Sequence, residues 1–156
     1  MDIVRTDDLA AVLSLGRAAG LTQTERDVEG IRALWTAVEA GEPVGAVMLR
    51  HDGGLDLVGW LAVREECRGR GLGRRLLATV EEQAVRSGIG RLWATARAPG
   101  FFLHHGYAVV DSGPAHDFLL GPCLSCAQYG RTCTPRAVSK VLSAGDEKEE
   151  RWRGPH

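Results

Sequence analysis

The sequence predicts a mixed α/β fold, with a sheet that contains at least one helical crossover. Residues 55–63 are almost continuously apolar, which is typical of a strand buried on both faces. Residues 71–87 show the apolar spacing of a long amphipathic helix. Short strand-like runs with turn residues between them lie on both sides of that helix, so the two element types alternate along the chain.

The first part of the chain predicts a short strand and two helices. Asp2–Arg5 is the strand, and Thr6, Asp7 and Asp8 are residue types that cap a helix. The helix that follows ends near Gly20, and a shorter helix is expected from Thr24 to about Val28. The first helix has an apolar face made of Leu9, Val12, Leu13 and Leu15.

A three-strand meander follows. We expect strands at 33–39, 44–50 and 55–63, separated by Gly41-Glu42-Pro43 and Asp52-Gly53-Gly54. The hydrophobic period alone leaves residues 35–39 ambiguous between strand and helix, and the turn residues at both ends favour a strand.

The long helix and five shorter elements fill the second half. Leu72, Leu76, Val80 and Ala84 lie on one face of the helix over 71–87, and Gly88 closes it. We then expect a strand at 91–95, a short helix at 101–105 begun by Pro99, strands at 107–110 and 115–120, and a last helix after Pro135. That last helix contains Ala137, Val138, Val141 and Leu142.

Composition narrows the class of protein. The chain has 156 residues, 44% of them apolar and 25% charged, with a net charge of −1, which predicts one globular domain over 1–142. The polar segment 143–156 is expected to be a disordered tail. The near-zero net charge gives no indication of a nucleic-acid partner. Without a signal-like N-terminus or a membrane-length apolar run, we expect no membrane association and a cytoplasmic location.

The segment Arg68-Gly69-Arg70-Gly71-Leu72-Gly73 carries the main chemistry. It joins the apolar strand to the long helix, and its glycines allow the backbone to approach a ligand closely. The N–H groups and dipole of the following helix favour an anion such as a pyrophosphate. Arg68, Arg70 and Arg74 add positive charge. We therefore predict a phosphate-binding loop, the alternative being a tight turn beside a solvated face of arginines.

Two better-known glycine motifs do not fit this loop. A dinucleotide fingerprint requires G-x-G-x-x-G and an acidic residue on the next strand, but residues 91–95 contain no acid. A Walker A motif requires a lysine that is absent here. The loop, together with Trp60-Leu61-Ala62-Val63 before it and Phe101–Tyr107 after it, resembles the acetyl-CoA motif of the GNAT N-acetyltransferase superfamily.

The resemblance covers about residues 1–110 and implies a fold, a cosubstrate and a reaction. The fold would be a mixed, mostly antiparallel sheet flanked by helices and splayed at a bulge in its central strand. The cosubstrate would be acetyl-CoA, its acetyl group passing directly to the primary amine of a small molecule or amino acid. A homodimer is also common in that superfamily. The Phe-Phe pair and Ala19-Gly20-Leu21 are similar to the branch with N-acetylglutamate synthase-like and arsenic-resistance-associated members.

The same resemblance assigns the cosubstrate's contacts to this chain. The backbone at Leu61, Ala62 and Val63 would bond the pantetheine arm. The pyrophosphate would lie on the amides of the loop and the start of the helix, at Arg68, Gly69, Arg70, Gly71, Leu72, Gly73 and Arg74.

One departure from the family concerns the acid that protonates the leaving thiolate. The family often has a tyrosine four residues before the glycine of its late motif, but this chain has Phe102 there, which cannot donate a proton. Solvent, Tyr129 or His105 would then supply the proton, while Tyr107 is expected to be structural.

Asp56 is the candidate base, since relatives carry a base glutamate near this point of the strand. The alternative is a hairpin-end carboxylate in water. His116 and Asp117, on an expected late strand, could also face the acceptor or simply lie on the surface.

Cys123, Cys126 and Cys133 lie in one segment, 121–135, in which C-x-x-C is a natural metal-chelating spacing. A zinc site would need a fourth ligand, such as Cys67 or His116. The alternatives are reduced thiols packed near the acceptor pocket and a redox role for Cys67. A catalytically weak acyl-CoA-binding protein, or a metal or thiol sensor on the same scaffold, is therefore the rival to an enzyme.

Overall fold

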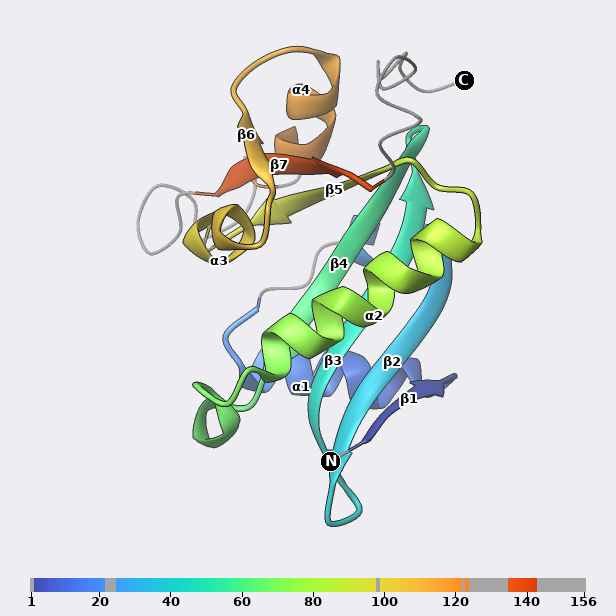
Figure 1. Cartoon of the computed structure of the whole chain (residues 1–156), viewed down its shortest axis with the longest axis vertical. Helices are drawn as coiled ribbons and strands as arrows, with labels where there is room; N and C mark the ends of the chain where they lie inside the picture. Colours follow the sequence, from blue (N-terminus) through green and yellow to red (C-terminus); the bar gives the residue numbers. More distant parts are fainter. Residues whose placement is uncertain (1, 22–24, 98, 122, 124–134, 143–156) are drawn as a thin grey trace. The chain divides into compact units, whose positions relative to one another are not determined.

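The computed structural model describes residues 2–21, 25–97, 99–121, 123 and 135–142 (Figure 1). Its strands form a seven-stranded mixed sheet in the order β1-β2-β3-β4-β5-β7-β6. The chain divides into two compact units, one of Met1–Arg50 and Val58–Gln83, the other of His51–Leu57 and Ala84–His156. The strands β3 and β4 and the helix α2 each contribute residues to both units.

The first unit holds the antiparallel strands β1 (Asp2–Thr6) and β2 (Ile31–Glu39), and most of β3 (Glu42–Asp52) and β4 (Leu55–Val63). The register places Ile3 opposite Ala37 and Trp35 opposite Val47. The helical segments are α1 (Leu9–Ala18), the short 3-10 turns η1 (Glu25–Val28) and η2 (Glu65–Cys67), and α2 (Leu72–Arg86). These elements confirm the predicted meander and the predicted long helix.

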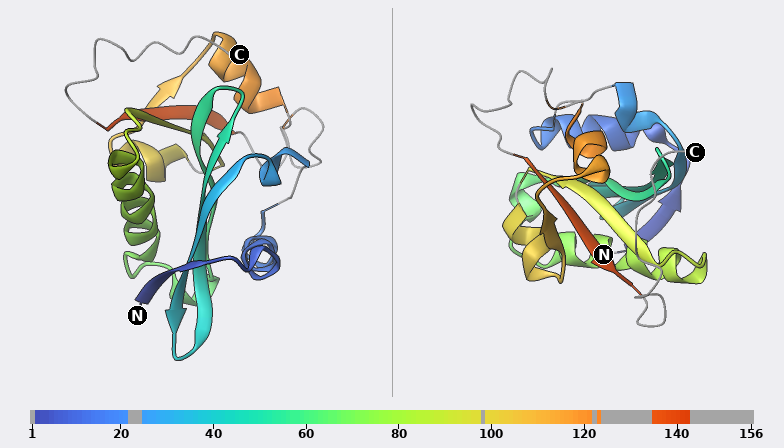
Figure 2. Two further views of the ribbon diagram at one scale, coloured as in Figure 1. Left: turned by 90° about the vertical axis from the view of Figure 1, so that its right-hand side faces the viewer. Right: turned by 90° about the horizontal axis from the view of Figure 1, so that it is seen from above.

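Two helices cover opposite faces of β2, β3 and β4, as the side view in Figure 2 shows for α1 and for residues 72–83 of α2. Asp8 caps α1 by accepting a hydrogen bond from the Ala11 N–H at 3.0 Å. The face of α1 packs into a core with β2, β3 and β4. The buried members of that core are Val12, Leu15, Leu34, Ala46, Met48 and Ala62.

The second unit holds β5 (Arg91–Ala96), α3 (Pro99–His104), β6 (Ala108–Val110), α4 (Pro114–Leu120) and β7 (Arg136–Val141). β5 runs parallel to β4, with Leu57 opposite Trp93, and β7 pairs antiparallel with both β5 and β6. Its core contains Leu55, Leu57, Trp93, Ala115, Leu119 and Ala137.

Two predicted elements in this unit are wrong. The strand expected at 115–120 is the helix α4, which Pro114 begins after Gly113 and which buries Ala115 and Leu119, one turn apart. The helix expected after Pro135 is the strand β7, because pairing with β5 and β6 supplies backbone hydrogen bonds that local sequence does not reveal. His116 and Asp117 therefore lie on a helix. Within the described ranges, no helix is long and apolar enough to cross a membrane.

Candidate functional site

β4 is distorted at Trp60, whose φ of +52° is unusual for a bulky residue. The indole fixes this conformation, because its Nε1 donates to the Val12 carbonyl of α1 at 2.9 Å. Gly16 makes room for the ring, since a Cβ at that position would lie 2.0 Å from Nε1. β4 pairs with β5 at Leu57, before this distortion. Trp60 thus marks the irregular point in the strand that the resemblance led us to expect.

The chain passes from the end of β4 through η2 into the glycine-rich loop. Gly69 and Gly71 have φ values of +80° and +76°, in the left-handed region that glycine tolerates best. No atom lies within 4 Å of where a Cβ would stand on either residue. These glycines are needed for the backbone path, and their open surroundings leave space for a ligand.

The first turn of α2 supplies backbone N–H groups that can donate hydrogen bonds. Among the described residues, the first backbone bond of this helix joins the Arg75 N–H to the Gly71 carbonyl at 3.1 Å. Within the described ranges, the amides before it, from Gly69 to Arg74, donate to no backbone carbonyl, as is usual for the first turn of a helix. Together with the helix dipole, they form an anion site.

Several contacts hold the loop in place. Arg68 donates from Nε to the Val63 carbonyl at 3.3 Å and from a terminal nitrogen to the Ala19 carbonyl at 3.4 Å. Leu72 is buried, and α2 approaches β3 closely at Gly45, where a Cβ would lie 2.9 Å from Leu76 Cδ1 and 3.3 Å from Leu72 Cδ2. The loop is therefore attached to β4, to the end of α1 and to the core.

Arg70 forms an ion pair that the sequence did not suggest. Its guanidinium lies 2.5 Å from a carboxylate oxygen of Glu39, at the end of β2. The hydrogen bond and the charge of Glu39 raise the pKa of Arg70, and Cys67 adds a smaller contribution in the same direction. Because the two residues are 31 positions apart, no local pattern could have indicated this contact.

Asp56 lies on β4 and is hydrogen-bonded to His51 of β3, with 2.8 Å between Asp56 Oδ1 and His51 Nδ1. The side chains are 29% and 40% exposed, so the carboxylate is neither buried nor alone in water. A carboxylate bonded to one imidazole nitrogen orients the ring and selects its tautomer. The sequence indicated Asp56 as a candidate base but gave no indication of its partner His51.

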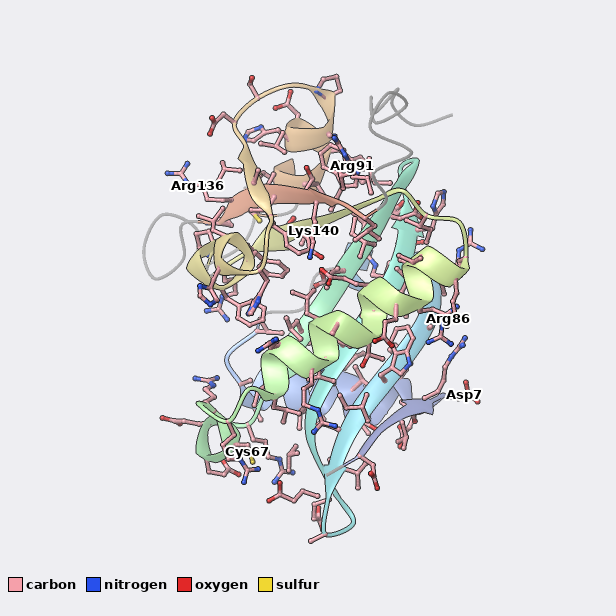
Figure 3. All side chains as sticks on the ribbon, in the orientation of Figure 1. Asp7, Cys67, Arg86, Arg91, Arg136 and Lys140 are labelled. Atoms are coloured by element: carbon pink, nitrogen blue, oxygen red, sulfur yellow. The ribbon has the colours of Figure 1, made fainter. Side chains whose placement is uncertain are left out.

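The aromatic motif after β5 is packed rather than open. Phe102 is buried and meets Tyr107 edge to face, with 5.1 Å between ring centroids. Lys140, labelled in Figure 3, donates to the His105 carbonyl at 3.0 Å and lies 5.6 Å from the centre of the Tyr107 ring. The buried position of Tyr107 fits the structural role expected for it.

The cysteine segment falls mostly outside the described residues. Cys126, Cys133 and Tyr129 are among those not described, and Cys123 is half-buried. Cys67 is a buried free thiol on the segment between β4 and α2 (Figure 3). In the part of the chain that the structure covers, no three His, Cys, Asp or Glu side chains gather so that they could hold a metal.

Comparison of this chain with known protein families and solved structures agrees with this geometry. A family model described as "Acetyltransferase (GNAT) domain" matches residues 30–109, just over half of the chain. No curated protein matches significantly.

Solved structures share the fold at low sequence identity. A GNAT family acetyltransferase from Elizabethkingia anophelis with acetyl-CoA bound is 17% identical, with a TM-score of 0.69 over 90% of this chain and 97% of that one. A Mycobacterium tuberculosis protein in complex with CoA and NLQ is 18% identical, with a TM-score of 0.66 over 92% and 100%. N-acetylglutamate synthase from Neisseria gonorrhoeae, with coenzyme A and N-acetyl-glutamate, is 17% identical, with a TM-score of 0.64 over 92% of this chain and 36% of that one.

Proposed function

Because this chain belongs to the GNAT acetyltransferase family, we propose that it moves the acetyl group of acetyl-CoA to the primary amine of a small molecule or amino acid. The observation that carries the proposal is the loop at Gly69–Gly71, where two left-handed glycines precede the open N-terminus of a well-anchored helix.

The cosubstrate's charged part is proposed to bind at this loop. The amides of residues 69–74 would donate to the pyrophosphate. Arg68 and Arg74 lie at the two ends of this segment and would add positive charge. The pantetheine arm would follow the backbone of Leu61, Ala62 and Val63, beside the distortion at Trp60. In this arrangement the chain holds acetyl-CoA chiefly through main-chain donors, which require no side-chain rearrangement on binding.

The proposed reaction is a direct transfer. The neutral amine nitrogen attacks the thioester carbonyl, a C–N bond forms, the C–S bond breaks, and CoA leaves as a thiolate. One proton must leave the amine, and the pair of Asp56 and His51 is our candidate to receive it. One proton must reach the thiolate, and with Phe102 in the tyrosine's place this falls to Tyr129, His105 or solvent.

Amino acids are the first acceptors to test, since one structural neighbour is named as N-acetylglutamate synthase. A homodimer and a cytoplasmic location remain predictions. So does zinc binding by Cys123, Cys126 and Cys133, two of which lie outside the described residues.

The experiment is a turnover assay. Purified protein is incubated with acetyl-CoA and a panel of amino acids and amines, and the acetylated product is measured by mass spectrometry. We expect product with at least one acceptor, and we expect Asp56→Asn to lower kcat at least tenfold, since one positioned acid or base contributes about 10²–10⁴-fold. Tight acetyl-CoA binding without product from any acceptor would instead favour a binding or sensor protein.

A further inference from the structure

Trp60 has a backbone conformation that its place in a strand does not require. Among the residues that the structure describes, the non-glycine residues with φ in the left-handed region are Ala40 and Trp60, at +51° and +52°. Ala40 lies with Gly41 in the two-residue turn between β2 and β3, a kind of turn that needs positive φ. Trp60 lies inside β4, where an L-residue adopts this conformation at a cost in free energy. The surrounding structure must therefore enforce it.

The contact that enforces it is with the backbone of α1. Trp60 Nε1 donates to the Val12 carbonyl at 2.9 Å. The ring also lies over Gly16, one turn further along the helix, where a Cβ would meet Nε1, Cε2 and Cζ2 at 2.0, 2.3 and 2.7 Å. Val12 and Gly16 are buried, and Trp60 packs against the core that contains Val12. Because a change of φ at Trp60 would redirect its side chain, the left-handed backbone and the position of the ring on α1 depend on each other.

A second contact attaches the other end of the same segment to α1. Arg68 donates to the Val63 carbonyl at 3.3 Å and to the carbonyl of Ala19, the last cap residue of α1, at 3.4 Å. Residues 60–68 are thus attached to one helix at both ends. The backbone that we assign to the pantetheine arm lies between these two attachments, directly after Trp60 in the sequence. The helix α1 therefore fixes the path of that backbone.

We propose that Trp60 is a positioning residue for acyl-CoA. Held by α1, its left-handed backbone sets the direction in which residues 61–63 present their N–H and C=O groups to the pantetheine arm. This inference rests on the proposed function. Directions alternate regularly along a strand, and one irregular residue re-aims the groups that follow it. Trp60 acts through the backbone of its neighbours, so its loss should weaken binding of the arm and leave the pyrophosphate site intact.

The first test compares two variants that both remove the ring, Trp60→Ala and Trp60→Gly. Glycine adopts positive φ readily, whereas alanine does not. We expect acetyl-CoA to bind the glycine variant about tenfold more tightly, because fewer molecules of the alanine variant hold the backbone that the cosubstrate needs. Isothermal titration calorimetry measures both Kd values. Equal affinity, or tighter binding by the alanine variant, is what a purely structural role of the ring predicts and would overturn the proposal.

The second test uses Trp60→Phe, which keeps an aromatic ring and removes the N–H that bonds the Val12 carbonyl. We expect its Kd for acetyl-CoA to rise about fivefold, the usual worth of one hydrogen bond. The control ligand is adenosine 3′-phosphate 5′-diphosphate, the part of CoA that lacks the pantetheine arm. Its Kd should stay within error of the parent's. A parallel loss for both ligands, or no loss for either, would contradict the role assigned to Trp60.

The control ligand also separates this inference from the folding of the variants. A variant that binds the nucleotide with the parent's affinity has an intact loop, so a loss of acetyl-CoA affinity then reports on the pantetheine arm alone. If the alanine or glycine variant does not fold, the result with Trp60→Phe supports or overturns the proposal by itself. Failure of the proposed function is distinct, because the parent would then bind no acetyl-CoA.

Discussion

Glu39 and Arg70 show how one residue can tune the proposed phosphate site. Because the Glu39 carboxylate engages Arg70 and repels phosphate, we expect Glu39→Gln to tighten acetyl-CoA binding. An exposed ion pair of this kind implies a change of about two- to fivefold in Kd at low salt, shrinking as ionic strength rises. Isothermal titration calorimetry measures this change in the Kd for acetyl-CoA.

The matched control for this prediction is Glu42→Gln, which removes the same charge from the exposed first residue of β3. It should leave Kd within error of the parent. Weaker binding in Glu39→Gln would show instead that the carboxylate holds Arg70 in its phosphate-binding position.

Local sequence indicated some residues of the proposed site but not others. The loop at Gly69–Gly71 was predictable because its glycines, strand and helix are contiguous. Glu39 was not, since it contacts Arg70, which lies 31 positions away in the sequence. His51 was missed although it lies five residues before Asp56, because the turn between them is what brings the two side chains together.

At the scale of elements, the packing of α1 on β4 depends on Gly16. An alanine there would place its Cβ 2.0 Å from Trp60 Nε1. We expect Gly16→Ala to destabilise the protein by about 1–3 kcal/mol through overpacking, which outweighs a helix-propensity gain of about 0.5–1 kcal/mol. Urea unfolding followed by circular dichroism measures the difference.

The control for the α1 prediction is a double-mutant cycle with Trp60→Leu, which removes the ring that the new methyl group meets. In that background Gly16→Ala should cost far less, or stabilise the helix. An equal cost in both backgrounds would mean that the clash with Trp60 is not the cause.

Element types were predictable where one strong periodic pattern acted alone. The strand 55–63 and the helix over 71–87 follow the predicted bounds closely, since burial on both faces and amphipathic spacing both leave clear patterns. α4 and β7 were not predictable, because their short segments fit the hydrophobic period of a helix and of a strand equally well. Pro114 at the start of α4 favours a helix there. In β7, pairing of Val138 with Ala94 and Val109 on the neighbouring strands favours a strand.

For the molecule as a whole, binding of acetyl-CoA should raise the melting temperature. A ligand at 100 times its Kd stabilises the folded state by about 2.7 kcal/mol, which corresponds to roughly 5–10 °C for a chain of this size. Differential scanning fluorimetry measures the shift. A short acetyl thioester without the pyrophosphate should produce no comparable shift, and an equal shift with both ligands would contradict phosphate-dependent binding.

The most direct test of the phosphate-binding loop is calorimetric titration of acetyl-CoA into the parent, Gly71→Asp and Gly88→Asp. Gly71 and Gly88 have φ values of +76° and +79° in equally open surroundings, and they flank the two ends of α2, so the substitutions impose matched backbone strain. We predict micromolar binding by the parent and by Gly88→Asp, and a loss of at least tenfold in Gly71→Asp, where the new carboxylate faces the pyrophosphate. No binding by the folded parent, or equal affinity in both variants, would contradict the account.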